Sequence, residues 1–589
     1  MRLPIYITLL FSFVFSSIEA EIFISHEKHA VRLAREGGYI NDVFLTGRTT
    51  EKDEYTIYYQ SLENISNISV EISHLNGAWK KVKNKTLKVE DIHSAHFYTG
   101  AKKYTIELEK DDQFKISYSI ASPELKVLSS SYLAGGYKTD STLYAFSIPF
   151  YYVFEWNIGK LDSSLVLKID TIKSTIGTDY SIRVYNPTRA DLCYSKIYHS
   201  IHKPGLSLTQ DLNNWEWKLV QQNDGIDDVT FNALKPSRSI QNDTLNYTWE
   251  LFNSVRKKIS YIAIEAGYGA WQPRPANTIF QNKKGDCKDM ANVIYQCLKK
   301  SGVECYLAMI LAISTKSDLN IPVQNNFNHM ICVAFINQQW ICLDATDDSS
   351  PFLYPSQHTQ GRTAFCISKD QAFEVKIPVI PIDSNLIRHH FDLSYSDGSV
   401  SGIWKIAYHG YPAADIKEMI LGTDPATIKL NMEHFLGKLL TKYTITDIIW
   451  SVNNLEQLSI EAKVKLSGQI LLHTNEKDYF SLSCLPKPIN LNLIESKCYW
   501  YKHTTSNIEI TSSVSFPFDA SLKNTFSSEL MEENATFHMT SSQENKNTIK
   551  FQYNYKNPNL EFNSSQYASM QKLNKSIEKI FKTIQEIIK

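Results

Sequence analysis

A cysteine stands at the predicted start of a helix, in the sequence Gly285-Asp286-Cys287-Lys288-Asp289. Asp286 is suited to cap the helix and Asp289, three residues later, to cap it in return, so the helix is predicted to begin at Cys287. Backbone N–H groups in a first helical turn favour a thiolate and can bind an oxyanion. The position therefore predicts a lowered thiol pKa and a nucleophile, and Gly285 would let the chain and a substrate approach closely.

Two predicted strands bring a histidine close to an aspartate. The strands Met330–Ile336 and Trp340–Ala345 flank a polar stretch, and a two-residue turn at Asn337-Gln338 would set their register. In that register His329 and Asp344 are diagonal neighbours on one face of the sheet, about 7–8 Å apart at the backbone. A three-residue turn would move one of them to the opposite face. In the two-residue register the carboxylate would orient the imidazole, which would exchange a proton with the cysteine sulfur.

Each of these three residues also has an ordinary explanation. A cysteine at a helix start is often a small buried residue, His329 could lie at a strand edge, and Asp344 could begin an acidic turn. A zinc site made of Cys287, His329 and Asp344 matches no common ligand spacing, so neither a metal nor a cofactor is expected. The combination is much more specific than any single residue, and we predict the three as catalytic.

The rest of the chain predicts a multidomain α+β protein of 589 residues. Residues 21–235 alternate β-branched and aromatic residues with polar ones, which is typical of an antiparallel β-sandwich. Residues 236–370 predict a mixed α+β core, with a helix at Thr244–Ile259. Residues 371–589 return to β patterning and end in an amphipathic helix at Ser569–Lys589. This helix is expected to dock on its own domain, with membrane-surface binding as the alternative.

The first twenty residues predict export. A basic Arg2 precedes an almost wholly apolar stretch, Leu3 to Ser17, and small residues lead to a cleavage site after Ala20. The alternative is an uncleaved anchor, although the stretch is short for a membrane span. No second apolar stretch reaches spanning length, so a periplasmic or extracellular protein without an integral span is expected after cleavage.

The charge balance of the chain argues against nucleic-acid binding, and its odd number of cysteines leaves a free thiol. Lys plus Arg (61) nearly balance Asp plus Glu (62), so no electrostatic footprint for nucleic acid or an anionic membrane is expected. Nine cysteines leave at least one thiol unpaired, and Cys287 is the candidate. Cys305, Cys332 and Cys342 are expected to be buried strand residues, and Cys484 and Cys498 could pair.

Several motifs together resemble the transglutaminase-like core, and more narrowly the bacterial exported proteins that carry this core behind an N-terminal domain of unknown function, DUF3857. They are Ile259 to Glu265, Trp271 to Ala276, Gly285 to Ala291, Phe327-Asn328-His329, Trp340 to Thr346 and Gly361-Arg362. The resemblance covers about 110 residues, and the flanking β regions agree only in layout. It implies a papain-like order of nucleophile, histidine and aspartate, carried here by Cys287, His329 and Asp344. Lys283-Lys284 departs from the aromatic-basic pair that often precedes Gly-Asp-Cys in the family.

The resemblance suggests two further site positions. Gln281, six residues before Cys287, has the spacing of an oxyanion-binding glutamine in papain-like enzymes. Trp271 could line an acyl-binding tunnel as an aromatic residue does in transglutaminases, and core packing is an equally open interpretation.

The expected function is cysteine-dependent acyl transfer or hydrolysis at amide bonds of a protein or peptide, with a cell-envelope component among the candidate substrates. Attack by the thiolate would give a thioester, which an amine or water would then resolve. The alternative is a non-catalytic exported binding or structural protein in which the core is vestigial.

Overall fold

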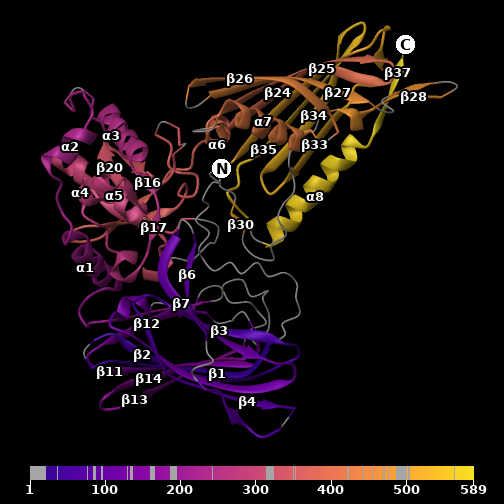
Figure 1. The fold of residues 1–589 in the computed structure, drawn as a ribbon. Helices are drawn as coiled ribbons and strands as arrows, with labels where there is room; N and C mark the ends of the chain where they lie inside the picture. The colour runs from indigo at the N-terminus through magenta and orange to yellow at the C-terminus, as the bar shows by residue number, and fades with distance from the viewer. Residues whose placement is uncertain are drawn as a thin grey trace.

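The computed structural model describes residues 22–588 apart from residues 36, 76, 84–87, 95–96, 129, 133–136, 159–165, 186–195, 242, 313–323, 349, 352, 421–423, 441, 455–456, 468–470, 475–476, 486–499, 502–504 and 563. The predicted leader therefore lies outside the described residues. Figure 1 shows a sheet-rich N-terminal region, a central region that carries most of the short helices, and a second sheet-rich region that ends the chain. The predicted multidomain α+β fold class is confirmed.

The N-terminal region is built on a nine-stranded sheet. Its order is β13 (Val166–Lys173), β14 (Gly177–Tyr185), β11 (Ser141–Pro149), β1 (Ile22–Leu33), β2 (Tyr39–Thr49), β8 (Asp112–Ser122), β4 (Asn64–His74) and β5 (Lys80–Lys81), with β10 (Lys138–Thr139) beside β1. Most pairs are antiparallel, as predicted, but β1 runs parallel to β11. Smaller sheets pack on this one through buried aliphatic and aromatic residues: β3 (Asp53–Tyr59), β7 (Phe97–Leu108) and β6 (Lys88–Ser94), and β12 (Val153–Ile158), β15 (Lys196–His202) and β9 (Ser130–Tyr132).

The central region places helices on one face of a five-stranded sheet. The sheet order is β21 (Gln339–Leu343), β20 (His329–Ile336), β19 (Cys305–Ile310), β22 (Thr363–Ile367) and β23 (Phe373–Lys376). The helices are α1 (Leu208–Gln221), α2 (Asp228–Leu234), α3 (Thr244–Lys258), α4 (Ala276–Asn282) and α5 (Cys287–Lys300). Short strands β16 (Ser260–Tyr261), β17 (Ala263–Ile264) and β18 (Lys284–Gly285) connect them. Cys305, Cys332 and Cys342 are buried free thiols on three of the strands, as expected.

The two helices before residue 235 belong to the central core. Leu212 and Val220 of α1 and Leu234 of α2 pack in the same buried cluster as the apolar face of α5. The predicted boundary at residue 235 falls between α2 and α3 and stays a prediction.

The C-terminal region is an eight-stranded sheet that packs against three helices. Its order is β26 (Thr444–Asn454), β27 (Gln457–Ser467), β25 (Ser399–His409), β24 (Leu386–Ser396), β31 (Ser506–Ser515), β35 (Thr548–Asn557), β34 (Ala535–Asn545) and β33 (Ser527–Glu532). The helices are α6 (Tyr411–Ile420), α7 (Pro425–Leu439) and α8 (Ser564–Phe581). Smaller sheets join β28 (Leu471–His473), β29 (Asp478–Ser481), β37 (Ile584–Ile588) and β32 (Ser521–Leu522), and β30 (Trp500–Tyr501) with β36 (Glu561–Phe562).

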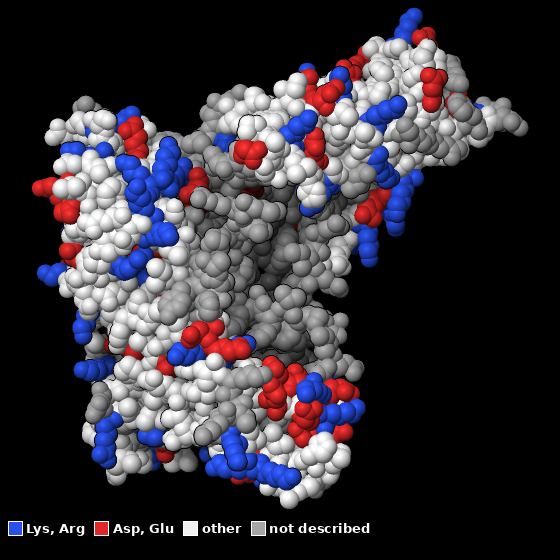
Figure 2. Space-filling view, viewed as in Figure 1, with Lys and Arg blue, Asp and Glu red and all other residues white. Residues whose placement is uncertain are grey.

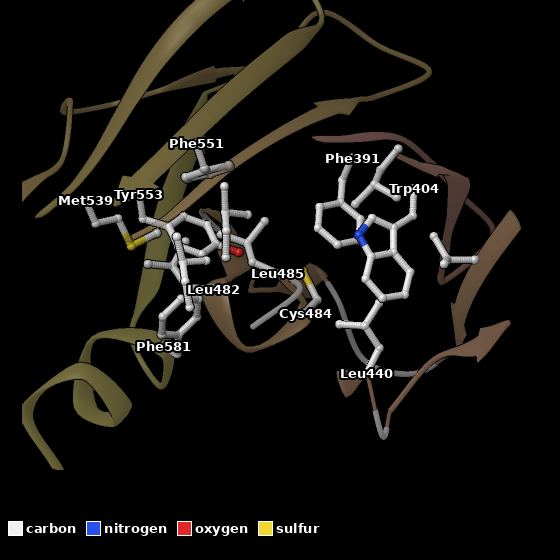
Figure 3. Close-up of a cluster of buried hydrophobic side chains, with 14 of the residues drawn as sticks. Phe391, Trp404, Leu440, Leu482, Cys484, Leu485, Met539, Phe551, Tyr553 and Phe581 are labelled. Atoms are coloured by element: carbon white, nitrogen blue, oxygen red, sulfur yellow. The ribbon is translucent and has the colours of Figure 1, made fainter. Parts of the chain in front are cut away.

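The predicted terminal helix is present but ends earlier than expected. Helix α8 ends at Phe581. The ring of Phe581 packs against that of Tyr553 with their centroids 5.4 Å apart, and Figure 3 shows both side chains in the buried cluster of this region. The prediction that the helix docks on its own domain is therefore confirmed. The last residues form strand β37 between β29 and β32, because β-branched isoleucines favour strands and both neighbours offer backbone partners.

Two other expectations concern thiols and surface charge. Cys484 is a buried free thiol, and Cys498 lies outside the described residues. Acidic and basic side chains both occur on each of the three regions in the face shown in Figure 2. Among the described residues, no helix combines the length and the hydropathy that crossing a bilayer requires.

Gly402 of β25 leaves no room for a side chain beside the paired strand β24. A Cβ atom there would lie 1.9 Å from the carbonyl oxygen of Asp392 on β24. We expect Gly402→Ala to lower the free energy of unfolding by about 2 kcal/mol, because the strands must separate to admit the methyl group. Urea denaturation measures this, and Ser401→Ala, at the exposed neighbouring position, should stay within about 0.5 kcal/mol of the wild type.

Candidate active site

Helix α5 begins at Cys287, as predicted. The Asp286 carboxylate accepts a hydrogen bond from the Asp289 N–H, and the Asp289 carboxylate accepts one from the Asp286 N–H, both at 3.2 Å. This reciprocal capping fixes the first turn of the helix. Met290 and the apolar residues that follow it pack into the central core, so the side of α5 facing the sheet is rigidly held.

Each of the two buried capping carboxylates also pairs with a basic side chain. The Asp289 carboxylate accepts hydrogen bonds from the Arg274 backbone N–H at 2.8 Å and from its Nε at 2.9 Å. The Lys288 ammonium pairs with the Asp286 carboxylate and approaches the Ile264 carbonyl oxygen at 3.4 Å. Both carboxylates are 1% exposed, so their charges are compensated inside the protein rather than by water.

Asp289→Asn is expected to destabilise the protein by about 2 kcal/mol, because an amide nitrogen would face the Arg274 and Asp286 donors. The value is below that of a fully buried pair since Arg274 remains 30% exposed. Denaturant unfolding tests this expectation. Asp228→Asn is the matched control: its carboxylate pairs with Lys300 at the surface, where solvent screens the pair, so the change should leave the denaturation midpoint close to that of the wild type.

Gly285 serves packing within the protein. A Cβ atom at this buried position would lie 2.9 Å from the Asp289 Cβ and 3.1 Å from the Ile279 Cγ2. The sequence predicted close approach of a substrate, whereas the residues that require the glycine are those of α4 and α5. Gly285 also pairs with Tyr261 in the short parallel ladder of β16 and β18.

The hairpin of β20 and β21 has the predicted register. Ile336 pairs with Gln339 and Cys332 with Leu343. The two turn residues, Asn337 and Gln338, have left-handed φ angles of 51° and 64°, as a two-residue hairpin turn of this kind requires. His329 at the start of β20 and Asp344 just after β21 therefore come to the same end of the sheet.

His329 and Asp344 are hydrogen-bonded and buried. The His329 Nε2 lies 2.9 Å from the Asp344 Oδ2, with the two side chains 4% and 1% exposed. The preceding residue, Asn328, fixes the start of β20, because its side-chain amide bonds both the N–H and the carbonyl of Ala312 at 2.8 Å. Since Nε2 faces the carboxylate, Nδ1 is the ring nitrogen left to exchange a proton with a thiol.

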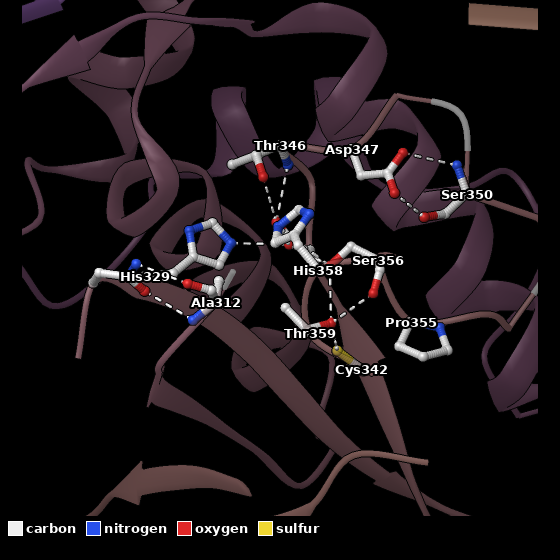
Figure 4. Close-up of polar contacts among 12 residues, drawn as sticks. Ala312, His329, Cys342, Thr346, Asp347, Ser350, Pro355, Ser356, His358 and Thr359 are labelled. Carbon is white, nitrogen blue, oxygen red and sulfur yellow. Dashed lines mark hydrogen bonds and ion pairs between the residues drawn. The ribbon is translucent and has the colours of Figure 1, made fainter. Parts of the chain in front are cut away.

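The Asp344 carboxylate receives contacts from four residues, several of which are drawn in Figure 4. Oδ2 also accepts from the Ser356 hydroxyl at 2.7 Å and lies 3.0 Å from the His358 Nε2. Oδ1 accepts from the Thr346 backbone N–H at 3.2 Å and hydroxyl at 2.7 Å. Burial alone would raise the pKa of this carboxyl, but the neighbouring His329 and His358 hold the pKa well below its usual range.

Ser356 and His358 lie on a connecting segment, residues 353–361, which we call the strap. The strap is held by the C-terminal region: the buried Tyr411 hydroxyl of α6 donates to the Pro355 carbonyl at 2.6 Å, and its ring packs edge-on against Tyr354. A sheet-rich region distant in sequence thus supports the contacts to Asp344.

The Cys287 sulfur accepts a hydrogen bond from the backbone N–H of Met330, the residue after His329, but the pKa of the thiol differs from expectation. Burial, with a smaller contribution from the Asp286 carboxylate, raises the pKa of the Cys287 thiol to about 12. The Lys288 ammonium and a hydrogen bond from the Met330 backbone N–H oppose this rise only in part. The predicted lowering of the thiol pKa is therefore wrong for the resting protein, because the tertiary fold removes water from the first turn of α5.

The resemblance also suggested Gln281 and Trp271 as site positions. Gln281 is exposed near the end of α4. Trp271 is half-buried, and its ring packs edge-on against that of Trp215 in α1, with centroids 5.9 Å apart. Their proposed roles in oxyanion binding and in a substrate tunnel remain predictions.

Sequence reasoning missed Tyr261, Lys288, Ser356 and His358. Burial raises the pKa of the Tyr261 phenol, and the nearby charges of Cys287 and Asp286 raise it further. Lys288 could have been found, since a lysine beside a candidate thiol is a recognised activating group. Ser356 and His358 gave no local signal, because only the tertiary fold returns the strap to Asp344.

A comparison of sequences matches residues 235–345 to the family model of the transglutaminase-like superfamily. The match spans α3, α5 and the hairpin, and ends one residue after Asp344. No curated protein matches the chain.

Among solved structures, the chain resembles a candidate protease from Parabacteroides distasonis at 12% identity with a TM-score of 0.60, covering 96% of this chain and 99% of the other. A candidate cysteine protease from Cytophaga hutchinsonii matches 57% of this chain and 84% of its own at 12% identity with a TM-score of 0.15. An M1 zinc metallopeptidase from Deinococcus radiodurans matches 31% of this chain and 43% of its own at 11% identity with a TM-score of 0.18. The last two TM-scores are too low to indicate a shared fold. The chain is therefore similar in overall fold to the P. distasonis protein, and its residues 235–345 are similar to the transglutaminase-like superfamily.

Proposed function

We propose that this protein is a cysteine-dependent enzyme that transfers or hydrolyses acyl groups at amide bonds of proteins or peptides. Cys287 is the nucleophile, His329 the general base and acid, and Asp344 the residue that orients the imidazole. The observation that carries the proposal is the buried His329–Asp344 hydrogen bond. A hydrogen bond from the backbone N–H of Met330, the residue after His329, to the Cys287 sulfur supports the assignment of Cys287 as their partner.

The reaction has two balanced halves. The Cys287 proton passes to the His329 Nδ1 while the sulfur attacks the carbonyl carbon, and the oxyanion that forms is stabilised by N–H groups at the start of α5. The C–N bond then breaks, and the amine leaves with the proton from His329. An amine or water gives its proton to His329 and attacks the thioester, which releases the acyl product and restores the thiol.

The raised pKa of Cys287 determines how His329 acts. Because the resting thiol is neutral at pH 7, the proton must leave as the sulfur attacks. Proton transfer by a positioned base typically accelerates such a step about 10²–10⁴-fold. Reaction at Cys287 should therefore depend on His329 even where the thiol itself stays equally accessible.

The first test is alkylation of the purified protein with iodoacetamide at pH 7, with the rate at each cysteine followed by mass spectrometry. Among the seven described cysteines Cys287 is half-buried, and the other six are buried. His329→Ala should slow labelling of Cys287 about tenfold or more. His434→Ala, at an exposed position on α7, is the matched control and should leave the rate unchanged.

The second test identifies the reaction. A mixture of peptides is incubated with the wild type and with Cys287→Ala in the presence of hydroxylamine. Hydroxamates formed only by the wild type would support acyl transfer, and new peptide termini would support proteolysis. If His329→Ala alkylates as fast as the wild type, Cys287 is merely exposed, and the non-catalytic binding protein becomes the better description.

We also propose that the chain is exported and that its N-terminal sheets correspond to DUF3857. The apolar stretch from Leu3 to Ser17 followed by small residues supports export. The position of the N-terminal sheets ahead of residues 235–345, which match the transglutaminase-like model, supports the domain assignment. N-terminal sequencing of the protein recovered outside the cytoplasm should begin at Glu21. A mature protein that retains the leader would contradict cleavage.

A further inference from the structure

Two imidazoles converge on one carboxylate oxygen in the candidate active site. The Asp344 Oδ2 lies 2.9 Å from the His329 Nε2 and 3.0 Å from the His358 Nε2. The two rings meet edge-on, with centroids 5.2 Å apart. One ligand atom from each of the three residues lies within 4.8 Å of the other two, and no other set of three metal-binding side chains is this close in the described part of the chain.

The carboxylate of this group is already oriented by neighbours. Ser356 bonds the same oxygen, and Thr346 bonds the other oxygen through its N–H and its hydroxyl. Hydrogen bonds of this kind to a metal-binding carboxylate are the usual means by which proteins orient a ligand. Tyr411 holds the strap through Pro355, so His358 is presented from an anchored segment.

The chemistry of the three donors suits zinc. Two imidazole nitrogens and one carboxylate oxygen are common zinc ligands, and three protein ligands leave a fourth position open. With metal–ligand distances of about 2.0–2.1 Å, tetrahedral zinc needs its ligand atoms about 3.3 Å apart. The two N···O distances are 2.9 and 3.0 Å and all three ligand atoms lie within 4.8 Å of one another, so side-chain shifts would bring them to that geometry. An ion would enter from the His358 side, because that side chain is 24% exposed while Asp344 is 1% exposed.

We propose that His329, Asp344 and His358 form a zinc-binding site whose occupation reversibly inactivates the enzyme. Zinc takes the Nε2 lone pair of His329, and the ring proton that faced Asp344 moves to Nδ1. The neutral ring then has no lone pair at Nδ1 to accept the Cys287 proton. Zinc binding itself is independent of the proposed function, and the inactivation rests on it.

Isothermal titration of the full-length Cys287→Ala variant with zinc chloride tests the site. This background removes any site formed by the thiol with His329. We expect one equivalent of zinc to bind, and His358→Gln in the same background should weaken binding about tenfold or more. His434→Gln is the matched control, and magnesium should not compete because it prefers oxygen ligands. Unchanged zinc affinity in the His358→Gln protein, or no binding, would overturn the site.

Alkylation of Cys287 in the wild type tests the inactivation. Zinc should slow labelling about tenfold or more, EDTA should restore the rate, and His358→Gln should be insensitive to the same zinc concentration. Slow labelling without zinc, together with zinc binding in the Cys287→Ala protein, would contradict the proposed function and leave the metal site standing. Zinc binding with no change in labelling would overturn the inactivation. Thermal unfolding of His358→Gln and of His358→Asn verifies that each variant is folded.

Discussion

Asp344→Asn is expected to lower kcat for acyl transfer by about 10⁴-fold, the size of loss seen when the orienting aspartate of a nucleophile–histidine–aspartate triad becomes an amide. Oδ2 accepts from His329 and Ser356, and Oδ1 accepts from Thr346. An amide offers one oxygen and one NH₂ group, so one of these sets of donors must face another donor. The imidazole would lose the partner that fixes its Nε2 proton and therefore its basic Nδ1.

The measurement is kcat for wild type and variant on the peptide substrate that the hydroxylamine assay identifies, with thermal unfolding to verify that the variant is folded. Asp348→Asn is the matched control: this exposed carboxylate lies four residues along the same turn, and the change should alter kcat less than about twofold. A folded Asp344→Asn protein with kcat within tenfold of the wild type would falsify the orienting role.

The parts of this site that local rules govern could be predicted from sequence. The reciprocal caps at Asp286 and Asp289 define a helix start within four residues. The turn at Asn337 and Gln338 sets a strand register whose side-chain period of two decides which residues share a face. Neither inference needs knowledge of the remaining chain, which explains why both are confirmed in detail.

What could not be predicted depends on parts of the chain that meet only in the fold. His358 reaches Asp344 because the strap turns back, and the strap is held by Tyr411 from the C-terminal region. The direction of the Cys287 pKa reverses for a similar reason, since desolvation by the assembled core outweighs the local effect of the helix start. The end of α8 also depends on distant parts of the chain, because the final isoleucines pair as a strand with β29 and β32.

These contacts give the C-terminal region a role in the site. Tyr411 is fully buried, and its hydroxyl reaches the Pro355 carbonyl, one residue before Ser356. The Gln357 amide adds a hydrogen bond to Asp415 of the same helix. Loosening α6 would therefore release the donors that hold Asp344, without any change in the hairpin itself.

Glu216→Gln is expected to make stability less dependent on pH. Glu216 is fully buried in α1, and burial raises the pKa of its carboxyl to about 8, which the neighbouring Gln324 lowers only in part. The folded protein therefore keeps this proton up to about pH 8, whereas the unfolded chain releases it near the usual 4.5. Because the native state binds the extra proton, stability is highest at low pH and falls by about 1.4 kcal/mol per pH unit across this window.

The glutamine amide is neutral at every pH and has nearly the same shape as a protonated glutamate, so the variant does not lose stability as the pH rises. Between pH 5 and pH 8, the variant should gain roughly 3 kcal/mol in unfolding free energy relative to the wild type. Urea denaturation of both proteins at the two pH values measures the difference, and the titration of all other groups cancels in it. Glu250→Gln, on the exposed side of α3, should show no such gain. Equal pH dependence of wild type and Glu216→Gln would mean that Glu216 is ionised in the fold, and its burial beside Gln324 would then require a compensating charge.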